Sequence, residues 1–359
     1  MRIVLCGGGT GGHVFPALAI GEALRAADHA VDLHYLGTAE GIESRLVPQA
    51  GEKLHHIAAG GIVGKSSLNR LSGLARAGLG VLQSLSALRS LKPDVVVGTG
   101  GFVMAPVLLA ARLLGIPFLI QEQNSFPGLT TRKFARHARA VFLAYPDAKG
   151  YLSGARTMLT GNPLRNAIVE QASVSSKVSS STPRTFVTGG SLGAKSINNA
   201  VAGSLAELCG VTRLAWQYGK TGLPATVDPA AVSELTAQQR LVCAPFFDDI
   251  HVHYADADIV VCRAGAMTLS ELPLYGLPAI LIPFPHAAHD HQRANAAALA
   301  KIGAVRVIED AELTGASLFQ AVAKLLADSD TRHAMSDAMR SIAKPRAAHD
   351  IAQYILTQH

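Results

Sequence analysis

A glycine-rich loop directly after an apolar N-terminal segment constrains this chain more than any other feature. The segment 2–6 reads as a strand, and it continues into Gly7-Gly8-Gly9-Thr10-Gly11-Gly12-His13. The segment 16–20 then predicts a helix that opens with Pro16 in its first turn. Glycines let backbone N–H groups approach an oxygen closely, and a helix N-terminus adds partial positive charge. The sequence therefore predicts an anion-binding turn between a strand and a helix.

The same kind of glycine loop follows two further apolar strands. Segment 184–188 leads into Gly189-Gly190-Ser191-Leu192-Gly193 and a helix from Ala194, and segment 95–97 leads into Gly98-Thr99-Gly100-Gly101. Strands alternate with helices through both halves, which predicts βαβ units and parallel sheets. Further strands are expected at 31–36, 53–57, 116–120, 140–143, 158–160, 213–217, 241–244, 259–262, 279–282 and 305–308.

The length of 359 residues favours two domains, and a hydrophobic content of 49% suffices for two large cores. The serine-rich segment 173–183 ends in proline and reads as a linker. We therefore predict an α/β protein of two open parallel-sheet domains that face each other across a cleft. Ligands are expected at the carboxyl ends of the strands, where the glycine loops lie.

The net charge of +6 favours an anionic partner, either a phosphate, a nucleic acid or an acidic membrane face, without choosing among them. Cys6, Cys209, Cys243 and Cys262 form no Cys-x-x-Cys motif, which indicates buried thiols in a reducing compartment. We expect no secretory signal, because the N-terminus starts on a strand, and no membrane span, because no uncharged apolar run reaches about 18 residues.

Two nucleotide-binding motifs are incomplete in this sequence. The spacing Gly7-x-Gly9-x-x-Gly12 matches the dinucleotide fingerprint, which also needs an acid at the end of the second strand. That strand ends in Leu36-Gly37-Thr38 and carries Asp32 at its beginning, so NAD binding is disfavoured. The loop 189–193 suits a diphosphate but lacks the Gly-Lys-Ser/Thr ending of a P-loop, so ATP hydrolysis is disfavoured as well.

His13 follows the first glycine loop at the start of a predicted helix. A helix N-terminus disfavours the imidazolium and keeps the ring neutral, as a general base requires. The alternative is a histidine that only hydrogen-bonds the loop, and the local sequence leaves both interpretations open.

Polar residues also follow strands in both halves. Thr268, after the strand at 259–262, can donate to a phosphate, and Glu271 can bind the two hydroxyls of a ribose. The alternative for Glu271 is an acid that stabilises the helix dipole. Gln121-Glu122-Gln123-Asn124 follows the strand at 116–120 and supplies amides that suit sugar hydroxyls.

The sequence offers two weak candidates for a metal site. Asp256-Ala257-Asp258 has the Asp-x-Asp pattern, but it precedes its strand and so lies at the wrong edge of the sheet. His286, His289 and His291 lack the i, i+4 spacing of a helical metal pair. We therefore expect neither a metal ion nor a resident cofactor.

The segment 65–92 reads as a helix rich in leucine, arginine and lysine. It is either an ordinary helix packed on the sheet, with its charges in solvent, or a basic amphipathic surface that rests on anionic lipid.

In combination these motifs resemble the MurG family of cell-wall glycosyltransferases over nearly the whole chain. The segments that carry the resemblance are 8–13, 100–102 with Pro106, 122–124, 161–165, 189–194, 263–268, and 290–292 with Asn295. The resemblance implies a GT-B fold with two Rossmann-like domains. It implies a membrane-facing acceptor domain at 1–163, a donor domain at 164–342, and a last helix within 343–359 that crosses back to the first domain.

The resemblance also implies an activity: inverting transfer of N-acetylglucosamine from UDP-N-acetylglucosamine to the C4 hydroxyl of undecaprenyl-diphospho-N-acetylmuramoyl-pentapeptide, without a catalytic metal. His13 is the expected base, and N–H groups at 191–193 are expected to stabilise the leaving diphosphate. The implied substrate-binding residues are Thr10, Gly11, Gly12, Asn124, Arg165, Ser191, Ile250, Ala266, Met267, Thr268, Leu269, Ser270, Glu271 and Gln292.

The implied partners are the two substrates, anionic membrane lipids and other cell-wall synthesis proteins, with no nucleic acid. The implied location is the cytoplasmic face of the membrane, as a peripheral protein. Three alternatives remain: a GT-B transferase that acts on a diacylglycerol or small aglycone, a non-catalytic UDP-sugar binder, and, least favoured, a dehydrogenase.

Overall fold

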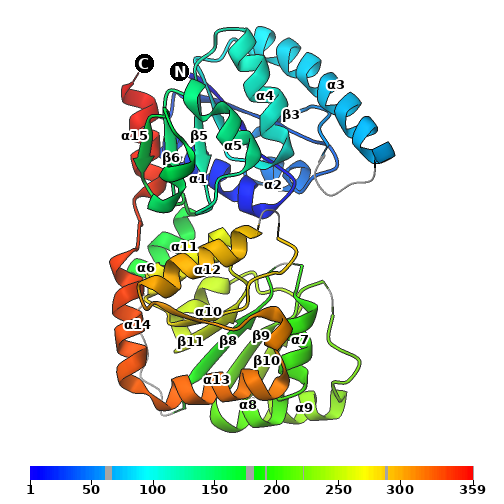
Figure 1. The fold of residues 1–359 in the computed structure, drawn as a ribbon, viewed down its shortest axis with the longest axis vertical. Coiled ribbons are helices and arrows are strands. Elements are labelled where there is room, and N and C mark those ends of the chain that lie inside the picture. Colours follow the sequence, from blue (N-terminus) through cyan, green and yellow to red (C-terminus); the bar gives the residue numbers. More distant parts are fainter. Residues whose placement is uncertain (61–66, 175–181, 191, 221, 288–289, 359) are drawn as a thin grey trace. The chain divides into compact units, whose positions relative to one another are not determined.

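The computed structural model describes the chain except residues 61–66, 175–181, 191, 221, 288–289 and 359, and it describes the backbone alone for 67–75. The chain divides into two compact units (Figure 1). Unit 1 contains Met1–Asn166 and Lys344–His359, and unit 2 contains Ala167–Ala343.

The described part of unit 1 is built on a seven-stranded sheet in the order β3-β2-β1-β4-β5-β6-β7, with every pair parallel. Its central strands are apolar throughout, and Val95, Val96 and Val97 are completely buried because helices cover both faces. The strands are β1 (Arg2–Cys6), β2 (Asp32–Gly37), β3 (Lys53–His56), β4 (Val95–Gly98), β5 (Phe118–Glu122), β6 (Val141–Leu143) and β7 (Thr157–Leu159).

Two apolar clusters fill the space between the sheet and the helices of unit 1. One cluster includes Ile351 and Ile355 of the last helix, which packs against α1, so the C-terminal segment completes this core (Figure 1). The helices are α1 (Gly11–Ala27), α2 (Glu43–Gln49), α3 (Ser67–Leu91), α4 (Gly101–Leu113), α5 (Leu129–Phe134), α15 (Ala347–Thr357) and the short 3₁₀ helices η1 (Ala135–His137) and η2 (Pro146–Tyr151).

The described part of unit 2 repeats the design with six parallel strands in the order β10-β9-β8-β11-β12-β13. The strands are β8 (Arg184–Thr188), β9 (Arg213–Gln217), β10 (Leu241–Ala244), β11 (Ile259–Cys262), β12 (Ala279–Leu281) and β13 (Val305–Val307). The helices are α6 (Asn166–Val174), α7 (Lys195–Ala202), α8 (Leu205–Val211), α9 (Pro229–Ala237), α10 (Ile250–Asp256), α11 (Ala266–Tyr275), α12 (His291–Lys301), η4 (Asp310–Glu312), α13 (Gly315–Ala327) and α14 (Ser329–Ser341). The prediction of two parallel-sheet domains is confirmed.

Two local predictions are wrong. Helix α1 begins at Gly11, not near Pro16, because the N–H groups of His13 and Val14 donate to the Thr10 carbonyl and close a turn before the proline. The serine-rich segment does not separate the two units, since Ser173 and Val174 end helix α6 and the boundary lies at Asn166. Residues 175–181 of that segment lie outside the described residues.

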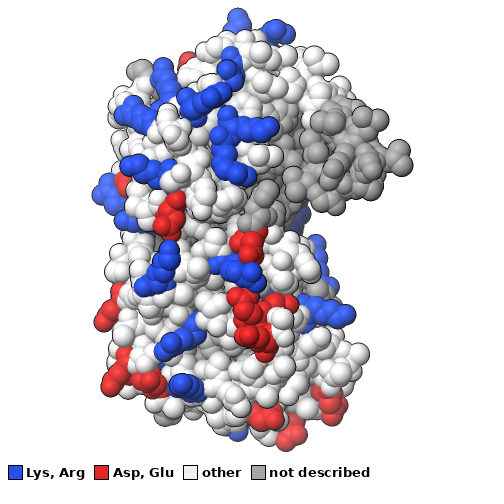
Figure 2. All heavy atoms as spheres, viewed as in Figure 1, with Lys and Arg blue, Asp and Glu red and all other residues white. Residues whose placement is uncertain are grey.

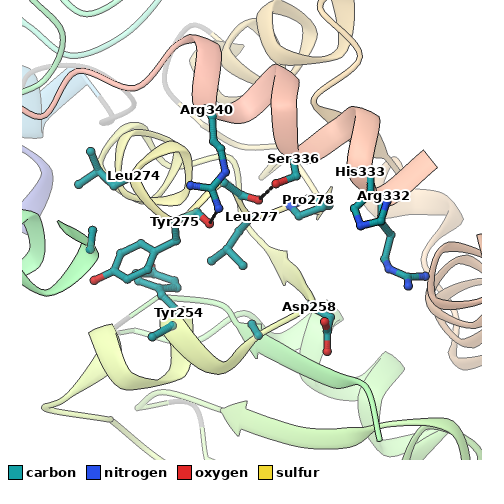
Figure 3. A pocket seen from close by; sticks show the side chains of 14 residues that line it. Tyr254, Asp258, Leu274, Tyr275, Leu277, Pro278, Arg332, His333, Ser336 and Arg340 are labelled. Carbon is teal, nitrogen blue, oxygen red and sulfur yellow. Dashed lines mark hydrogen bonds between the residues drawn. The ribbon is translucent and has the colours of Figure 1, made fainter. Parts of the chain in front are cut away.

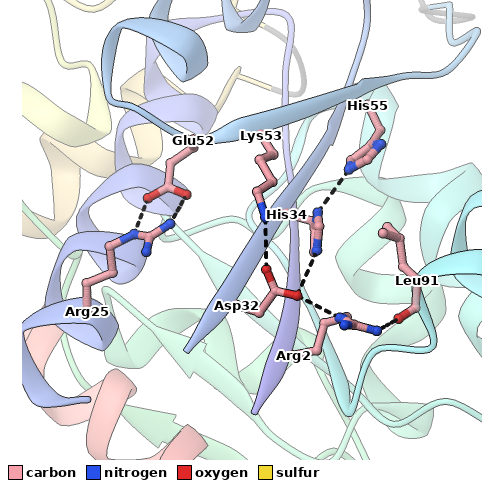
Figure 4. A network of polar contacts seen from close by, with 8 residues as sticks. All are labelled: Arg2, Arg25, Asp32, His34, Glu52, Lys53, His55 and Leu91. Atoms are coloured by element: carbon pink, nitrogen blue, oxygen red, sulfur yellow. Dashed lines mark hydrogen bonds and ion pairs between the residues drawn. The ribbon is translucent and has the colours of Figure 1, made fainter. Parts of the chain in front are cut away.

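A polar cluster links β1, β2 and the edge strand β3 of unit 1 (Figure 4). Asp32 accepts hydrogen bonds from Arg2 (2.8 Å), from Lys53 (3.2 Å) and from His34 Nε2 (3.2 Å). The other ring nitrogen of His34 lies 3.0 Å from His55 Nε2 on the neighbouring strand. The hydrogen bond from Arg2 holds the pKa of Asp32 well below its usual range, and the bonds from His34 and Lys53 act in the same direction.

We expect this cluster to make the protein less stable as the pH falls below about 6.5. Burial lowers the pKa of His55 from 6.5, and His34 and Lys53 act in the same direction. His55 therefore binds a proton more readily in the unfolded chain than in the folded chain. The free energy of unfolding is unaffected by His55 above pH 6.5, and it falls as the pH drops below that value. Urea unfolding at pH 7.5 and pH 5.5 measures this. The variant His55→Gln should show a smaller drop than the parent, and an equal drop in both proteins would contradict the assignment.

Candidate functional site

Three loops meet at the carboxyl ends of β1, β4 and β5 in unit 1. Gly101 has a φ of 76°, and a Cβ there would collide with the carbonyl oxygen of Gly8. Gly100 has a φ of 108°, and its Cβ would lie 2.5 Å from Cδ2 of His13. The side chain of Gln123 donates to the carbonyl of Thr99 at 2.6 Å. Gly101 needs to be glycine because it meets the backbone of the first loop, and Gly100 because it meets the His13 side chain.

His13 lies in the first turn of α1, and its ring faces the glycine loop. Its Nδ1 is 3.2 Å from the carbonyl oxygen of Gly8 and 3.2 Å from the hydroxyl of Thr10. A carbonyl only accepts, so this contact favours the neutral tautomer with the proton on Nδ1. That tautomer leaves Nε2 as the basic nitrogen, on the side of Gly100. The geometry therefore fits a general base, and it also contains the loop hydrogen bond of the alternative interpretation.

One N–H of the first glycine loop is already used within the protein. The N–H of Gly9 donates to the side chain of Glu43 at 3.1 Å, and this carboxylate is completely buried. Thr10 is exposed, while Gly11 and Gly12 are half-buried at the start of α1. No sequence pattern pointed to Glu43, because it lies 34 residues from Gly9 in a segment without a motif.

The amides expected in the loop after β5 are only partly available. Pairing with β6 continues through Gln121 and Glu122, so both belong to the strand. Gln121, Glu122 and Gln123 are buried, and Gln121 donates to Asn162 at 2.8 Å. Gln121 and Gln123 were expected to offer amides to sugar hydroxyls, and in the structure both side chains are buried and bonded within the protein. Asn124 is half-buried and remains a candidate.

Glu122, at the end of β5, accepts several hydrogen bonds from the loop that follows this strand. It accepts from the backbone N–H groups of Asn124 (3.1 Å) and Gly128 (3.0 Å) and from the side chain of Asn124 (3.3 Å). Burial raises the pKa of the Glu122 carboxyl, while hydrogen bonds from Thr131, Asn124 and Gly128 act in the opposite direction. This carboxylate fixes the position at which Asn124 enters the loop.

Arg165 falls in unit 1, and its guanidinium lies 4.8 Å from the ring centre of Phe15 on α1. Phe15 in turn packs against Gly11. Arg165 therefore stands beside the beginning of α1 and the first glycine loop, where its cation–π contact holds it.

In unit 2, helix α11 starts at the carboxyl end of β11. Gly265 is the N-cap, and Ala266, Met267, Thr268 and Ser270 are half-buried around the first turns, whereas Leu269 is buried and can offer only its backbone. The N-terminus of such a helix favours an anion. Glu271 is 8% exposed and accepts a hydrogen bond from the buried Tyr254 hydroxyl at 3.0 Å. Tyr254 thereby fixes the carboxylate.

The glycine loop after β8 differs from its prediction. Ser191 lies outside the described residues. The N–H of Gly193 donates to the Gly190 carbonyl (3.0 Å), and the N–H of Gly190 donates to the Thr188 hydroxyl (3.0 Å). The expectation that the Gly193 N–H faces a diphosphate is therefore wrong, because the loop uses it internally.

Two further candidates lie at helix starts in unit 2. Ile250 is the first residue of α10 and is half-buried. Gln292 is the second residue of α12, and its side-chain oxygen accepts from the Phe284 N–H at 3.0 Å. That contact ties Gln292 to the loop after β12.

A cavity of about 300 Å³ in unit 2 lies at the opposite edge of its sheet (Figure 3). It is lined by Asp258 and Pro278, which precede β11 and β12, and by Arg340 of α14. Arg340 donates to the Tyr275 carbonyl at 3.3 Å and packs over Gly276, which closes the end of α11. The glycine loops lie at the other ends of the strands, so this cavity lies away from them, and it meets the candidate site only at Tyr254, the hydrogen-bond partner of Glu271.

The acids of the Asp-x-Asp sequence have structural partners. Asp256 pairs with Arg184 at 2.6 Å, and Asp258 accepts from the backbone N–H of Arg184 at 2.7 Å. Within the described residues, no group of three or more His, Cys, Asp or Glu could hold a metal ion. No helix of the described residues has the length and apolar content to cross a membrane.

The two parallel-sheet units, each with glycine loops at the carboxyl ends of its strands, place the protein in the GT-B class of glycosyltransferases. The models of the glycosyltransferase family 28 N-terminal and C-terminal domains match residues 3–143 and 184–353. The crystal structure of Acinetobacter baumannii MurG is similar, with a TM-score of 0.78, 30% identity and 99% of each chain covered.

Curated relatives carry one long name, UDP-N-acetylglucosamine--N-acetylmuramyl-(pentapeptide) pyrophosphoryl-undecaprenol N-acetylglucosamine transferase. The relative from Desulforudis audaxviator is 42% identical, with 99% of this chain and 98% of that protein covered. The one from Methylococcus capsulatus is also 42% identical, at the same coverages. The chain therefore belongs to glycosyltransferase family 28, and within it to the MurG family of transferases.

Proposed function

We propose that this enzyme transfers N-acetylglucosamine from UDP-N-acetylglucosamine to the C4 hydroxyl of undecaprenyl-diphospho-N-acetylmuramoyl-pentapeptide, with inversion at the anomeric carbon, in peptidoglycan synthesis. The substrates are those in the names of relatives that match the chain end to end. The proposed chemistry depends on the geometry of His13. Its Nδ1 lies 3.2 Å from the Gly8 carbonyl, so the proton is on Nδ1 and Nε2 is the basic nitrogen.

The reaction forms a bond from the acceptor oxygen to the anomeric carbon and breaks the bond from that carbon to the UDP oxygen. His13 Nε2 takes the hydroxyl proton as the oxygen attacks. Negative charge grows on the departing diphosphate. The helix N-terminus of α11, at Ala266–Thr268, and the hydroxyl of Ser191 are proposed to stabilise it.

The remaining residues are assigned to binding. In unit 2, Glu271 takes the ribose hydroxyls, Ile250 meets the uracil through its backbone, Leu269 and Ser270 support the turn, and Gln292 contacts the sugar. In unit 1, Asn124 contacts the sugar, Arg165 lies near the nucleotide, and Thr10, Gly11 and Gly12 line the acceptor side.

We also propose that the enzyme acts as a peripheral protein on the cytoplasmic membrane face, because its acceptor is anchored in lipid. Figure 2 shows Lys and Arg gathered on one face of unit 1, with few acids among them. Helices α3 and α4 pack together and expose Leu79 (50%), Leu82 (65%) and Leu113 (64%). The same two helices also carry the exposed Arg76 and Arg112, and exposed leucines on helices with basic side chains suit an anionic lipid surface. Of the expected amphipathic segment 65–92, residues 65 and 66 lie outside the described residues, and the side chains of 67–75 are not described.

The double variant Leu79→Asp with Leu82→Asp is therefore expected to lose most of its binding to anionic vesicles in a sedimentation assay. Two apolar contacts are lost, and two negative charges are repelled by the lipid. Activity on a water-soluble acceptor should be retained. A matched control is Val242→Asp on β10, which is 47% exposed and lies in unit 2. Unchanged vesicle binding of the double variant would refute the proposed surface.

The proposed reaction is tested by incubating the enzyme with UDP-N-acetylglucosamine and a short-chain analogue of the lipid-linked acceptor, with mass analysis of the products. The expected result is a product heavier by one N-acetylglucosamine, together with free UDP. UDP release with a diacylglycerol but not with this acceptor would favour the alternative transferase. Tight UDP binding without release would favour a non-catalytic binder.

A further inference from the structure

Glu43 occupies a site built around its carboxylate, in the first turn of α2 beneath the glycine loop of unit 1. The side chain is completely buried. It accepts from the Gly9 N–H at 3.1 Å, from the Thr38 N–H at 3.1 Å and from the Thr38 hydroxyl at 2.6 Å. Because an ionised carboxylate only accepts, three converging donors suit this form of Glu43.

Nearby glycines make room for this carboxylate. A Cβ on Gly8 would lie 2.5 Å from Glu43 Oε1, and a Cβ on Gly37 would lie 2.8 Å from its Cγ. A Cβ on Gly41 would collide with the carboxylate itself. The chain therefore keeps three glycines around one buried acid, which is more than a single loop hydrogen bond requires.

The peptide group between Gly8 and Gly9 connects this acid to His13. Its N–H, on Gly9, donates to Glu43 Oε2 at 3.1 Å, and its carbonyl, on Gly8, lies 3.2 Å from His13 Nδ1. The two hydrogen bonds are therefore made by opposite ends of one planar amide. A carboxylate that accepts from the N–H polarises the amide and makes its carbonyl a stronger acceptor, as in other hydrogen-bonded chains.

We propose that Glu43 is a positioning residue that acts on His13 through the Gly8–Gly9 peptide. The relay holds the imidazole with its proton on Nδ1 and Nε2 basic. It also stabilises the imidazolium that forms when Nε2 takes a proton. The positive ring then donates to the Gly8 carbonyl, whose peptide group is polarised by the buried Glu43 carboxylate. The Thr10 hydroxyl, 3.2 Å from Nδ1, shares this N–H as a second acceptor. The proposal rests on His13 as the base of the proposed function.

The test is the isosteric variant Glu43→Gln, measured in two ways. In protein labelled with ¹⁵N-histidine, the His13 ring is expected to titrate at a lower pH than in the parent, by roughly one unit, since a buried negative charge about two hydrogen bonds away is lost. The acidic limb of the kcat–pH profile should move to lower pH by a similar amount, with KM for the donor little changed.

Two controls separate the relay from a structural role. Thr38→Val removes a hydrogen bond to the Glu43 carboxylate but keeps the carboxylate charge. It should lower the stability of the protein and leave the acidic limb of the kcat–pH profile unchanged. Glu40→Gln removes an acid whose side chain is 79% exposed and lies 3.4 Å from Arg76, and it should change neither readout. A His13 titration that does not move in Glu43→Gln, while the variant remains folded, overturns the relay.

The NMR arm needs no substrate, so it separates the relay from the proposed function. If the His13 titration moves while the kcat limb stays in place, the relay exists but His13 is not the base. That outcome overturns the catalytic part of the proposal. If Glu43→Gln fails to fold, the same measurements on Glu43→Asp decide. A shorter carboxylate keeps the charge but loses its reach to the Gly9 N–H, so the expected shift is in the same direction and smaller, and its absence overturns the relay.

Discussion

Replacement of His13 by alanine is expected to lower kcat by roughly 10²- to 10⁴-fold, which is the usual contribution of a general base. The ring is half-buried at the start of α1, so its removal leaves no large internal cavity and the fold should persist. The KM for UDP-N-acetylglucosamine should change little, because the residues proposed to bind the nucleotide lie mainly in unit 2. Steady-state release of UDP at saturating acceptor measures both constants.

The matched control is His29→Ala, which removes an exposed histidine in the turn after the same helix and should leave kcat unchanged. Circular dichroism and thermal unfolding of both variants establish that they are folded. A folded His13→Ala enzyme that retained the parent kcat would eliminate His13 as the base. It would leave His13 with the loop hydrogen bond alone, as the other interpretation of the sequence holds.

Replacement of Glu271 by alanine is expected to raise the KM for UDP-N-acetylglucosamine by roughly 10- to 150-fold. This range corresponds to the loss of about 1.5–3 kcal/mol, the contribution of a hydrogen bond to a charged group. The carboxylate is 8% exposed, so its bonds to ribose hydroxyls form in a site with little competing water. Binding of UDP, measured by calorimetry, should weaken by a similar factor.

Glu271 also accepts from Tyr254, and this structural role needs its own control. Tyr254→Phe removes only that hydroxyl and keeps the ring packing against Phe186 and Tyr275. It should raise KM by much less than Glu271→Ala does. Equal effects of the two variants would mean that Glu271 supports the fold of α10 and α11 rather than the ribose.

The sequence predicted the strands well, because most of them are short apolar runs, and three of these runs lead into glycine loops. Segments 2–6, 184–188, 213–217, 241–244 and 259–262 coincide with strands of the structure. Errors arose where a polar side chain continues a strand. Gln121 and Glu122 were expected in a loop, yet pairing of β5 with β6 includes both.

The site was predicted less completely, because its polar groups are held by partners far apart in the sequence. Gln123 donates to Thr99, and Gln121 donates to Asn162, so these amides stabilise the loops instead of facing a ligand. Only the folded chain brings such pairs together. His13 was found because one local motif contains both the histidine and the glycine loop it contacts.

The sequence by itself determined the α/β alternation, the glycine loops and the family, because these are written in consecutive residues. The tertiary structure alone decided that Glu43 lies beneath the first loop and that Arg165 stands beside α1. It also decided that the Gly193 N–H is used within its own loop. The physical reason is that a buried acid is stable only where donors converge on it, and those donors come from segments whose meeting depends on how the sheet is assembled.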